Sequence, residues 1–180
     1  MTLTITFERF NKNNIFIETG SLFGCGIKRA ITAGYKKIIS IELAEYYYQF
    51  CKSHFSQYGN RVEIVHGDSG KILGDVINKF NEPMTFWLDG HYSGGSESGV
   101  PETAGANVQS PLMAELEFIR NHPIKTHAIL VDDLEPEMEE IIKHKIFQIN
   151  PEYTIEYVSC PVDSNATLYK TVLLAYIWKF

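Results

Sequence analysis

The stretch that most constrains the fold is residues 15–26, IFIETGSLFGCG, where an apolar run meets an acid and then breaks into glycines. The run ending at Glu18 is typical of a buried strand. Gly20 and Gly24 give the backbone the freedom to turn tightly into a following helix. The unpaired N–H groups and positive end of such a helix suit a bound ligand. The stretch therefore predicts a nucleotide cradle, although a simple glycine turn in any α/β domain has the same pattern.

The spacing of the glycines distinguishes between classes of cofactor. A dinucleotide fingerprint requires Gly-x-Gly-x-x-Gly, but Leu22 stands where its second glycine would be. Glu18 would also repel a pyrophosphate, whereas it would attract the sulfonium and ammonium groups of S-adenosylmethionine. The loop therefore favours S-adenosylmethionine over a dinucleotide.

Length and composition indicate one globular domain. The chain has 180 residues, 44% of them hydrophobic, so residues 1–180 are expected to form a single domain. The formal net charge is −6 and no dense run of lysine or arginine occurs, which argues against nucleic acid as a partner. The three cysteines are far apart and form no metal-binding or redox pair. With neither a signal peptide nor a membrane span in view, we expect a cytoplasmic protein.

Strand and helix patterns alternate along the chain. After the first strand, further strands are expected at residues 37–43, 61–66, 84–88, 126–131, 153–158 and 171–179. Helices are expected at residues 26–33, 44–57, 71–80, 111–121 and 134–147, the last of them only as a solvated cover. This order predicts an α/β fold with one doubly wound, Rossmann-like sheet that is mostly parallel and has an antiparallel last strand.

Carboxylates follow most of the expected strands, and parallel strands end at one edge of a sheet. Glu42 stands where an α/β nucleotide fold places an acid that accepts hydrogen bonds from ribose hydroxyls, and Asp68 could contact an adenine or cap the next helix. Asp89, Asp132 and Asp133 offer oxygen ligands to a divalent ion such as Mg²⁺, although each could instead cap a turn or a helix. Such crowded acids need a positive charge among them.

Over residues 15–180 the chain resembles the class I S-adenosylmethionine-dependent methyltransferases. The resemblance is carried by the loop Glu18-Thr19-Gly20-Ser21-Leu22-Phe23-Gly24, by Glu42 and by the closing pair of strands. Asp89 with Asp132 and Asp133 resembles the metal triad of the cation-dependent O-methyltransferases, including the catechol and macrolide-sugar enzymes. His91 falls where the macrolide-sugar and cephalosporin-type relatives place a catalytic histidine.

This resemblance implies methyl transfer from S-adenosylmethionine to the hydroxyl group of a small acceptor such as a sugar, assisted by Mg²⁺. Catalytic roles are expected for His91, as the base, and for Asp89. The residues expected to bind the cofactor are Glu18, Gly20, Ser21, Gly24, Glu42, Asp68 and Ser69.

Two departures from that family keep alternatives open. Asp132 follows Asp89 by 43 positions, a long gap that contains the glycine- and serine-rich loop 93–110. The N-terminal helices that usually cover the acceptor are missing, so either a second subunit closes the pocket or the substrate is large or exposed. Other hypotheses are a catalytically silent S-adenosylmethionine-binding module or subunit, and a nicotinamide-dependent oxidoreductase.

Overall fold

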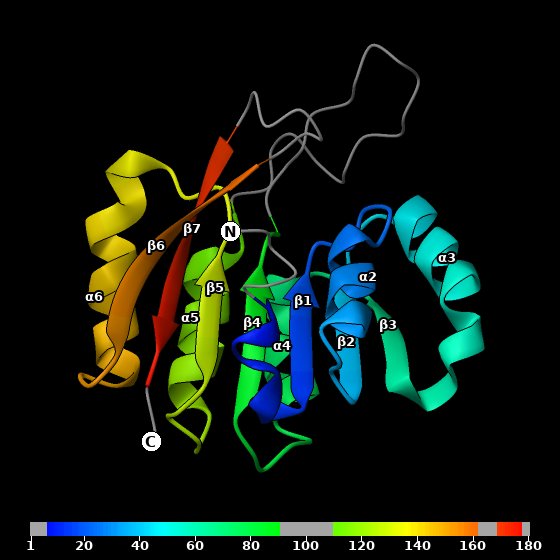
Figure 1. The fold of residues 1–180 in the computed structure, drawn as a ribbon, viewed down its shortest axis with the longest axis horizontal. Coiled ribbons are helices and arrows are strands. Elements are labelled where there is room, and N and C mark those ends of the chain that lie inside the picture. Colours follow the sequence, from blue (N-terminus) through cyan, green and yellow to red (C-terminus); the bar gives the residue numbers. More distant parts are fainter. Residues whose placement is uncertain (1–6, 91–109, 162–168, 178–180) are drawn as a thin grey trace.

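A seven-stranded sheet organises the protein, as seen in a computed structural model that describes residues 7–90, 110–161 and 169–177 (Figure 1). The strands are β1 (Ile15–Thr19), β2 (Lys37–Glu42), β3 (Val62–His66), β4 (Met84–Leu88), β5 (Ala128–Val131), β6 (Thr154–Pro161) and β7 (Tyr169–Tyr176). Their order is β3-β2-β1-β4-β5-β7-β6. The first five pair in parallel, whereas β7 is antiparallel to both of its neighbours. The predicted sheet with its reversed strand is confirmed.

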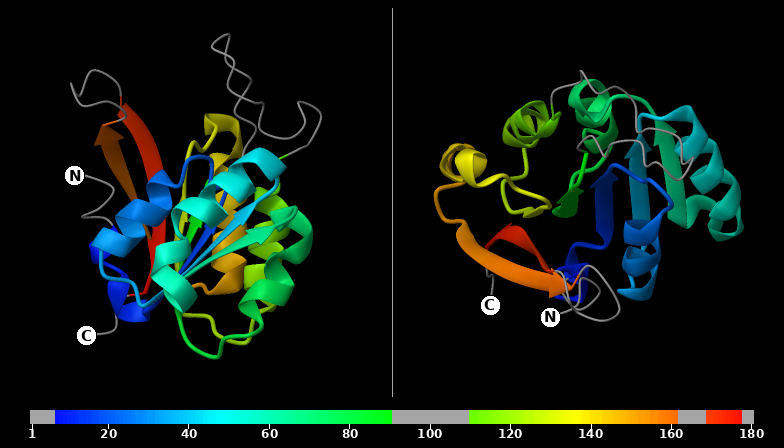
Figure 2. Two further views of the ribbon diagram at one scale, coloured as in Figure 1. Left: turned by 90° about the vertical axis from the view of Figure 1, so that its right-hand side faces the viewer. Right: turned by 90° about the horizontal axis from the view of Figure 1, so that it is seen from above.

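Helices cover both faces of this sheet (Figure 2). They are α2 (Cys25–Thr32), α3 (Glu45–His54), α4 (Ser69–Ile77), α5 (Leu112–Asn121) and α6 (Glu139–Ile149), with short 3-10 turns η1 (Asn11–Asn13), η2 (Ser56–Arg61) and η3 (Pro136–Met138). Side chains of α2 and α3 belong to one hydrophobic core, and those of α4, α5 and α6 to the other. Of the helices described here, none has the length and apolar character needed to cross a membrane.

The interior strand β1 shows why the sheet needs helices on both sides. All five of its residues are buried. Ile15 and Ile17 belong to the core beneath α4, α5 and α6, and Phe16 belongs to the opposite core with Ile27 and Ala30 of α2. A parallel strand buried on both faces reads as a continuous apolar run, as this one does.

Helix α6 differs from the expectation of a solvated cover. It begins at Glu139, after η3, and it buries Ile142, Ile146 and Ile149 in the core shared with α4 and α5. These isoleucines are spaced four and three residues apart, which places them on one helical face. The predicted helix began at residue 134 and therefore included the 3-10 turn Pro136–Met138. The residues of this turn do not follow the α-helical spacing, which hid the apolar face.

The N-terminal segment is held against the reversed edge of the sheet. The Arg9 guanidinium donates to both carboxylate oxygens of Glu156 on β6, at 3.1 and 2.9 Å, and the Tyr176 hydroxyl donates to the same group at 2.9 Å. Phe7 is fully buried and packs against Phe16 and Trp87. Residues far apart in the chain therefore close the core near β1 and β4.

Two buried histidines connect the amino ends of β4 and β5, at the edge opposite the glycine loop. The backbone N–H of Met84 donates to Nδ1 of His127 at 3.0 Å, and Nε2 of His127 lies 3.1 Å from Nδ1 of His122. Nε2 of His122 lies 3.1 Å from the carbonyl oxygen of Phe80, which can only accept. The partners therefore assign a neutral Nε2–H form to both rings.

Burial is the main cause that lowers the pKa of His127 to about 3, and His122 and Lys125 act in the same direction. Because the unfolded chain protonates this histidine below pH ~6.5, stability should fall as the pH drops from ~6.5 toward 3. We expect His127 to contribute a loss of about 2 kcal/mol between pH 7 and pH 5. Urea unfolding of wild type and His127→Asn at pH 7 and pH 5 measures the loss of stability in each protein. Equal losses in the two proteins would contradict the prediction, and His54→Asn, at an exposed site, serves as the control.

Candidate cofactor and metal site

The carboxyl edge of the sheet continues its hydrogen-bond ladder one residue beyond the strands. The N–H of Gly20 donates to the Ile41 carbonyl at 2.9 Å. The N–H of Asp89 donates to the Thr19 carbonyl, and that of Asp132 to the Leu88 carbonyl, both at 3.1 Å. Strand register therefore places Gly20, Asp89 and Asp132 side by side, because β1 lies between β2 and β4 and β4 lies between β1 and β5.

Three carboxylates gather at this edge. One oxygen from each of Asp89, Asp132 and Asp133 lies within 4.8 Å of the other two. Asp132 is buried, Asp133 is exposed and Asp89 is intermediate, so the group is open to solvent on one side. Three hard oxygen donors at this spacing fit a divalent ion such as Mg²⁺, whose remaining positions water or substrate oxygens would take.

Backbone strain also concentrates here. Among the described residues, the non-glycine positions with positive φ are Asn14, Leu22 and Asp133, at 59°, 46° and 47°. Leu22 lies in the glycine loop and Asp133 in the acidic triad. Such conformations cost about 1–3 kcal/mol and cluster at functional sites.

Gly20 joins the glycine loop to the acidic triad. Its φ is +84°, and a Cβ there would lie 2.5 Å from the carbonyl oxygen of Asp89. A side chain at this position would therefore collide with backbone. Only glycine allows the loop after β1 and the end of β4 to approach this closely.

Glu42 organises the glycine loop from the end of β2. Its Oε2 accepts from the N–H groups of Ser21 and Leu22, at 2.9 and 3.0 Å, and its Oε1 accepts from the N–H of Ala44 at 2.8 Å. The side chain is 5% exposed. These hydrogen bonds hold the glycine loop in its conformation. The resemblance to class I methyltransferases implies that the same carboxylate lies beside the ribose of the cofactor.

Glu18 lies beneath the loop and is not open to solvent. It is 1% exposed, and the Ser40 hydroxyl donates to its Oε2. The Ser40 and Ser21 hydroxyls are 2.6 Å apart. Burial is the main cause that raises the pKa of Glu18 to about 8; Asp89 and Glu42 act in the same direction, and the Ser40 hydrogen bond opposes it. Gly26 is required above it, because a Cβ there would overlap Glu18 Oε1.

Asp68 acts as the helix cap that was one of its two expected roles. Its Oδ1 accepts from the N–H of Gly70 at 3.0 Å at the start of α4, and its Oδ2 pairs with Lys71 at 2.9 Å. Ser69 is the first residue of α4 and is buried. Gly24 adopts φ +73° and is the N-cap of α2. His91, the expected base, and loop residues 93–109 lie outside the described residues.

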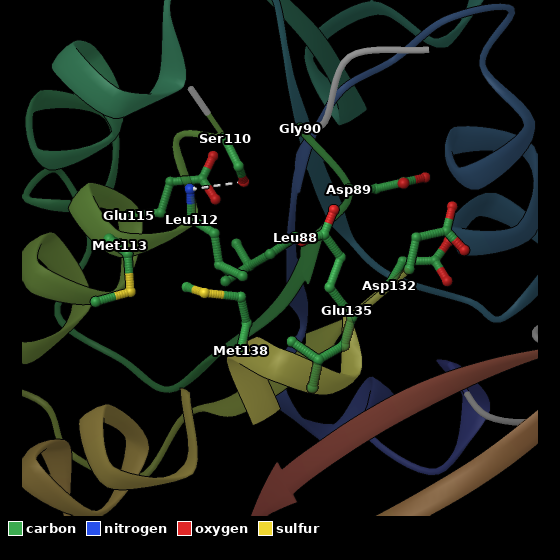
Figure 3. Close-up of a pocket in the computed structure, with 12 residues that line it drawn as sticks. Leu88, Asp89, Gly90, Ser110, Leu112, Met113, Glu115, Asp132, Glu135 and Met138 are labelled. Carbon is green, nitrogen blue, oxygen red and sulfur yellow. Dashed lines mark hydrogen bonds between the residues drawn. The ribbon is translucent and has the colours of Figure 1, made fainter. Parts of the chain in front are cut away.

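A cavity of about 440 Å³ opens beside the triad, between α5 and the segment leading into α6 (Figure 3). Its walls are mostly apolar, with acids among them. The described lining consists of Leu88, Asp89, Gly90, Ser110, Leu112, Met113, Glu115, Asp132, Asp133, Leu134, Glu135 and Met138. Its position over the ends of β4 and β5 is where α/β sheets bind ligands.

The order β3-β2-β1-β4-β5-β7-β6, with β7 reversed, can be compared with solved structures. An O-methyltransferase from Bacillus cereus, solved with S-adenosylhomocysteine, superposes with a TM-score of 0.66 over 98% of this chain and 79% of its own. The protein has a class I methyltransferase fold. The sequence identity to that methyltransferase is 14%.

Other class I methyltransferases give the same result. The O-methyltransferase TomG from Streptomyces achromogenes, involved in tomaymycin synthesis and solved with S-adenosylmethionine, has a TM-score of 0.60 at 13% identity, covering 98% and 78% of the two chains. The Podospora anserina methyltransferase PaMTH1 has a TM-score of 0.57 at 13% identity, covering 99% and 76%. No protein-family model matches the chain, and a search of curated proteins finds no relative.

The sequence patterns did not identify two buried polar residues of this methyltransferase fold. Ser40 interrupts the apolar strand β2 and binds Glu18. Glu115 lies on the inward stripe of α5 with Leu116 and Ile119, is 1% exposed and lines the cavity. In both cases the signal was a polar residue at a position that the periodicity assigns to the core.

Proposed function

We propose that this protein is an S-adenosylmethionine-dependent methyltransferase that methylates a hydroxyl group on a small acceptor, such as a sugar, with help from a divalent ion. The observation that carries the proposal is the contact between Gly20 and the Asp89 backbone. It joins the loop of a methyltransferase fold directly to a triad with the donor atoms and spacing of a Mg²⁺ site.

Each part of the site has a role in this reaction. Glu42 and the loop Gly20–Gly24 would bind S-adenosylmethionine, which supplies an activated methyl group. Asp89, Asp132 and Asp133 would hold Mg²⁺, whose Lewis acidity favours the ionised acceptor hydroxyl. The cavity walls would exclude water and hold the acceptor in line with the methyl group, which supplies much of the rate. His91 stays our proposed base, and a second copy of the chain could complete the pocket.

Calorimetry with S-adenosylmethionine, NAD and Mg²⁺ tests this proposal. We expect micromolar binding of S-adenosylmethionine, no binding of NAD, and saturable binding of Mg²⁺. Mass spectrometry of a hydroxyl-compound panel would then detect S-adenosylhomocysteine together with a methylated product. Binding of NAD in place of S-adenosylmethionine would overturn the assignment, whereas cofactor binding without turnover of any acceptor would favour a silent binding module.

Glu42→Gln should weaken S-adenosylhomocysteine binding at least about 10-fold. A glutamine amide has one acceptor oxygen, so its NH₂ group must face either the Ser21 and Leu22 N–H groups or the Ala44 N–H. The loop then loses part of its support. Titration calorimetry measures the change, and Glu45→Gln, an exposed acid three residues later, is the control. Unchanged affinity in Glu42→Gln would show that this carboxylate does not organise the cofactor site.

A further inference from the structure

The described charged residues that line the cavity beside the triad are all acidic. Its described lining includes Asp89, Glu115, Asp132, Asp133 and Glu135, and it includes no lysine, arginine or histidine. A bound divalent ion and the net positive charge of S-adenosylmethionine would offset only part of this negative charge. The remainder favours a positively charged group on whatever else enters the cavity.

Glu115 is the acid that the metal site leaves unexplained. It is 1% exposed, and among the described residues neither carboxylate oxygen has a hydrogen bond of good geometry, although the hydroxyls of Ser69 and Thr19 lie nearby. The Thr19 hydroxyl is also buried and likewise has no hydrogen bond of good geometry to any described residue. The two groups converge below Gly90, where a Cβ would lie 3.3 Å from Glu115 Oε1 and 3.4 Å from Thr19 Oγ1. Figure 3 shows the Glu115 side chain reaching from α5 into the region lined by the cavity residues.

An unpaired buried carboxylate is costly, so such a group usually has a partner in the functional state. Burial is the main cause that raises the pKa of Glu115 to about 7; Asp68 and Asp89 act in the same direction, and the Ser69 and Thr19 hydroxyls oppose it. A cation beside Glu115 would restore its charged form. An anionic acceptor would instead meet like charge on several sides of the cavity.

We propose that the acceptor carries an amino group, and that Glu115 binds this group as an ammonium ion while the apolar walls hold the rest of the molecule. This inference rests on the proposed function and specifies its substrate class: a cationic hydroxyl compound of moderate size. Leu112, Met113 and Met138 supply the apolar contacts, and Glu115 supplies the charge that selects the amine. Glu115 is thus a specificity residue, separate from the three metal ligands.

Three phenols of similar shape and different charge test the proposal: tyramine, para-ethylphenol and phloretate, which are cationic, neutral and anionic. Their dissociation constants are measured by calorimetry at one ionic strength, on protein loaded with S-adenosylhomocysteine and Mg²⁺. We expect wild type to bind tyramine at least about 10-fold more tightly than phloretate. Glu115→Gln should reduce that ratio at least about 5-fold, mainly by weakening tyramine.

Glu117→Gln is the matched control, because Glu117 lies on the same helix but is exposed and pairs with Arg120. It should leave the ratio unchanged. Equal affinities for the three probes, a preference for phloretate, no binding of any probe, or a ratio unaffected by Glu115→Gln would each overturn the inference. Wild-type protein alone decides the charge preference if Glu115→Gln fails to fold. Failure to bind S-adenosylhomocysteine would instead overturn the proposed function itself.

Discussion

Asp132→Asn is expected to weaken Mg²⁺ binding at least about 100-fold, because changes merely adjacent to a metal ligand already cost 10–100-fold. Asparagine keeps the shape of the side chain and one oxygen, but it removes the negative charge from the buried member of the triad. Binding of S-adenosylhomocysteine should stay within about 3-fold of wild type, since the loop and Glu42 are untouched. Methyl transfer that depends on the ion should fall at least as far as metal affinity does.

Titration with Mg²⁺, in the absence of any acceptor, measures this effect without relying on turnover. Glu135→Gln is the matched control, because it removes one negative charge from the same cavity without removing a triad ligand. It should change Mg²⁺ affinity only slightly. Equal affinities of wild type and Asp132→Asn would show that the three carboxylates do not form a metal site.

Gly20→Ala is expected to destabilise the protein by about 2 to 5 kcal/mol and to weaken cofactor and metal binding together. Alanine at φ +84° is strained, and its Cβ would collide with the Asp89 carbonyl at 2.5 Å. Relief requires the loop after β1 to separate from the end of β4, which moves both sites. Urea unfolding gives the loss of stability, and calorimetry on the folded variant gives the two affinities.

Gly34→Ala provides the comparison, since Gly34 has a similar φ of +88°, but the one atom of the described residues near its missing Cβ is the Asn11 amide nitrogen, at 3.8 Å. Its cost should be about 1 kcal/mol, from backbone strain alone. The difference between the stability losses of the two variants then measures the cost of the collision with the Asp89 carbonyl. If both variants lose the same stability and Gly20→Ala keeps its ligands, the close approach is not what holds the site together.

Much of the fold could be predicted from the sequence, because apolar runs separated by helical periodicity leave few arrangements other than a doubly wound sheet. Asp89 and Asp132 could be placed together for the same reason, since parallel strands end at one edge. The sequence could not show that Asp68 caps α4, because capping and adenine binding require the same residue at the same place.

The features that could not be predicted from the sequence depend on packing between elements that are distant in the chain. Nothing near Ser40 in the sequence indicates that it faces Glu18, because that contact depends on the pairing of β1 with β2. The burial of Glu115 depends on how closely α5 approaches Gly90, just after β4, and Thr19, at the end of β1. The buried isoleucines of α6 were missed because the predicted helix started five residues too early.

The ladder bonds from Asp89 to Thr19 and from Asp132 to Leu88 make the candidate site part of the sheet itself. Successive strand residues point to opposite faces, so a shift of β4 by a single residue would put Leu88 or Gly90 where Asp89 now stands. The triad can therefore assemble only in a sheet whose strands have found their native alignment. Metal and cofactor uptake would consequently report on folding quality, distinguishing native protein from compact forms with slipped strands.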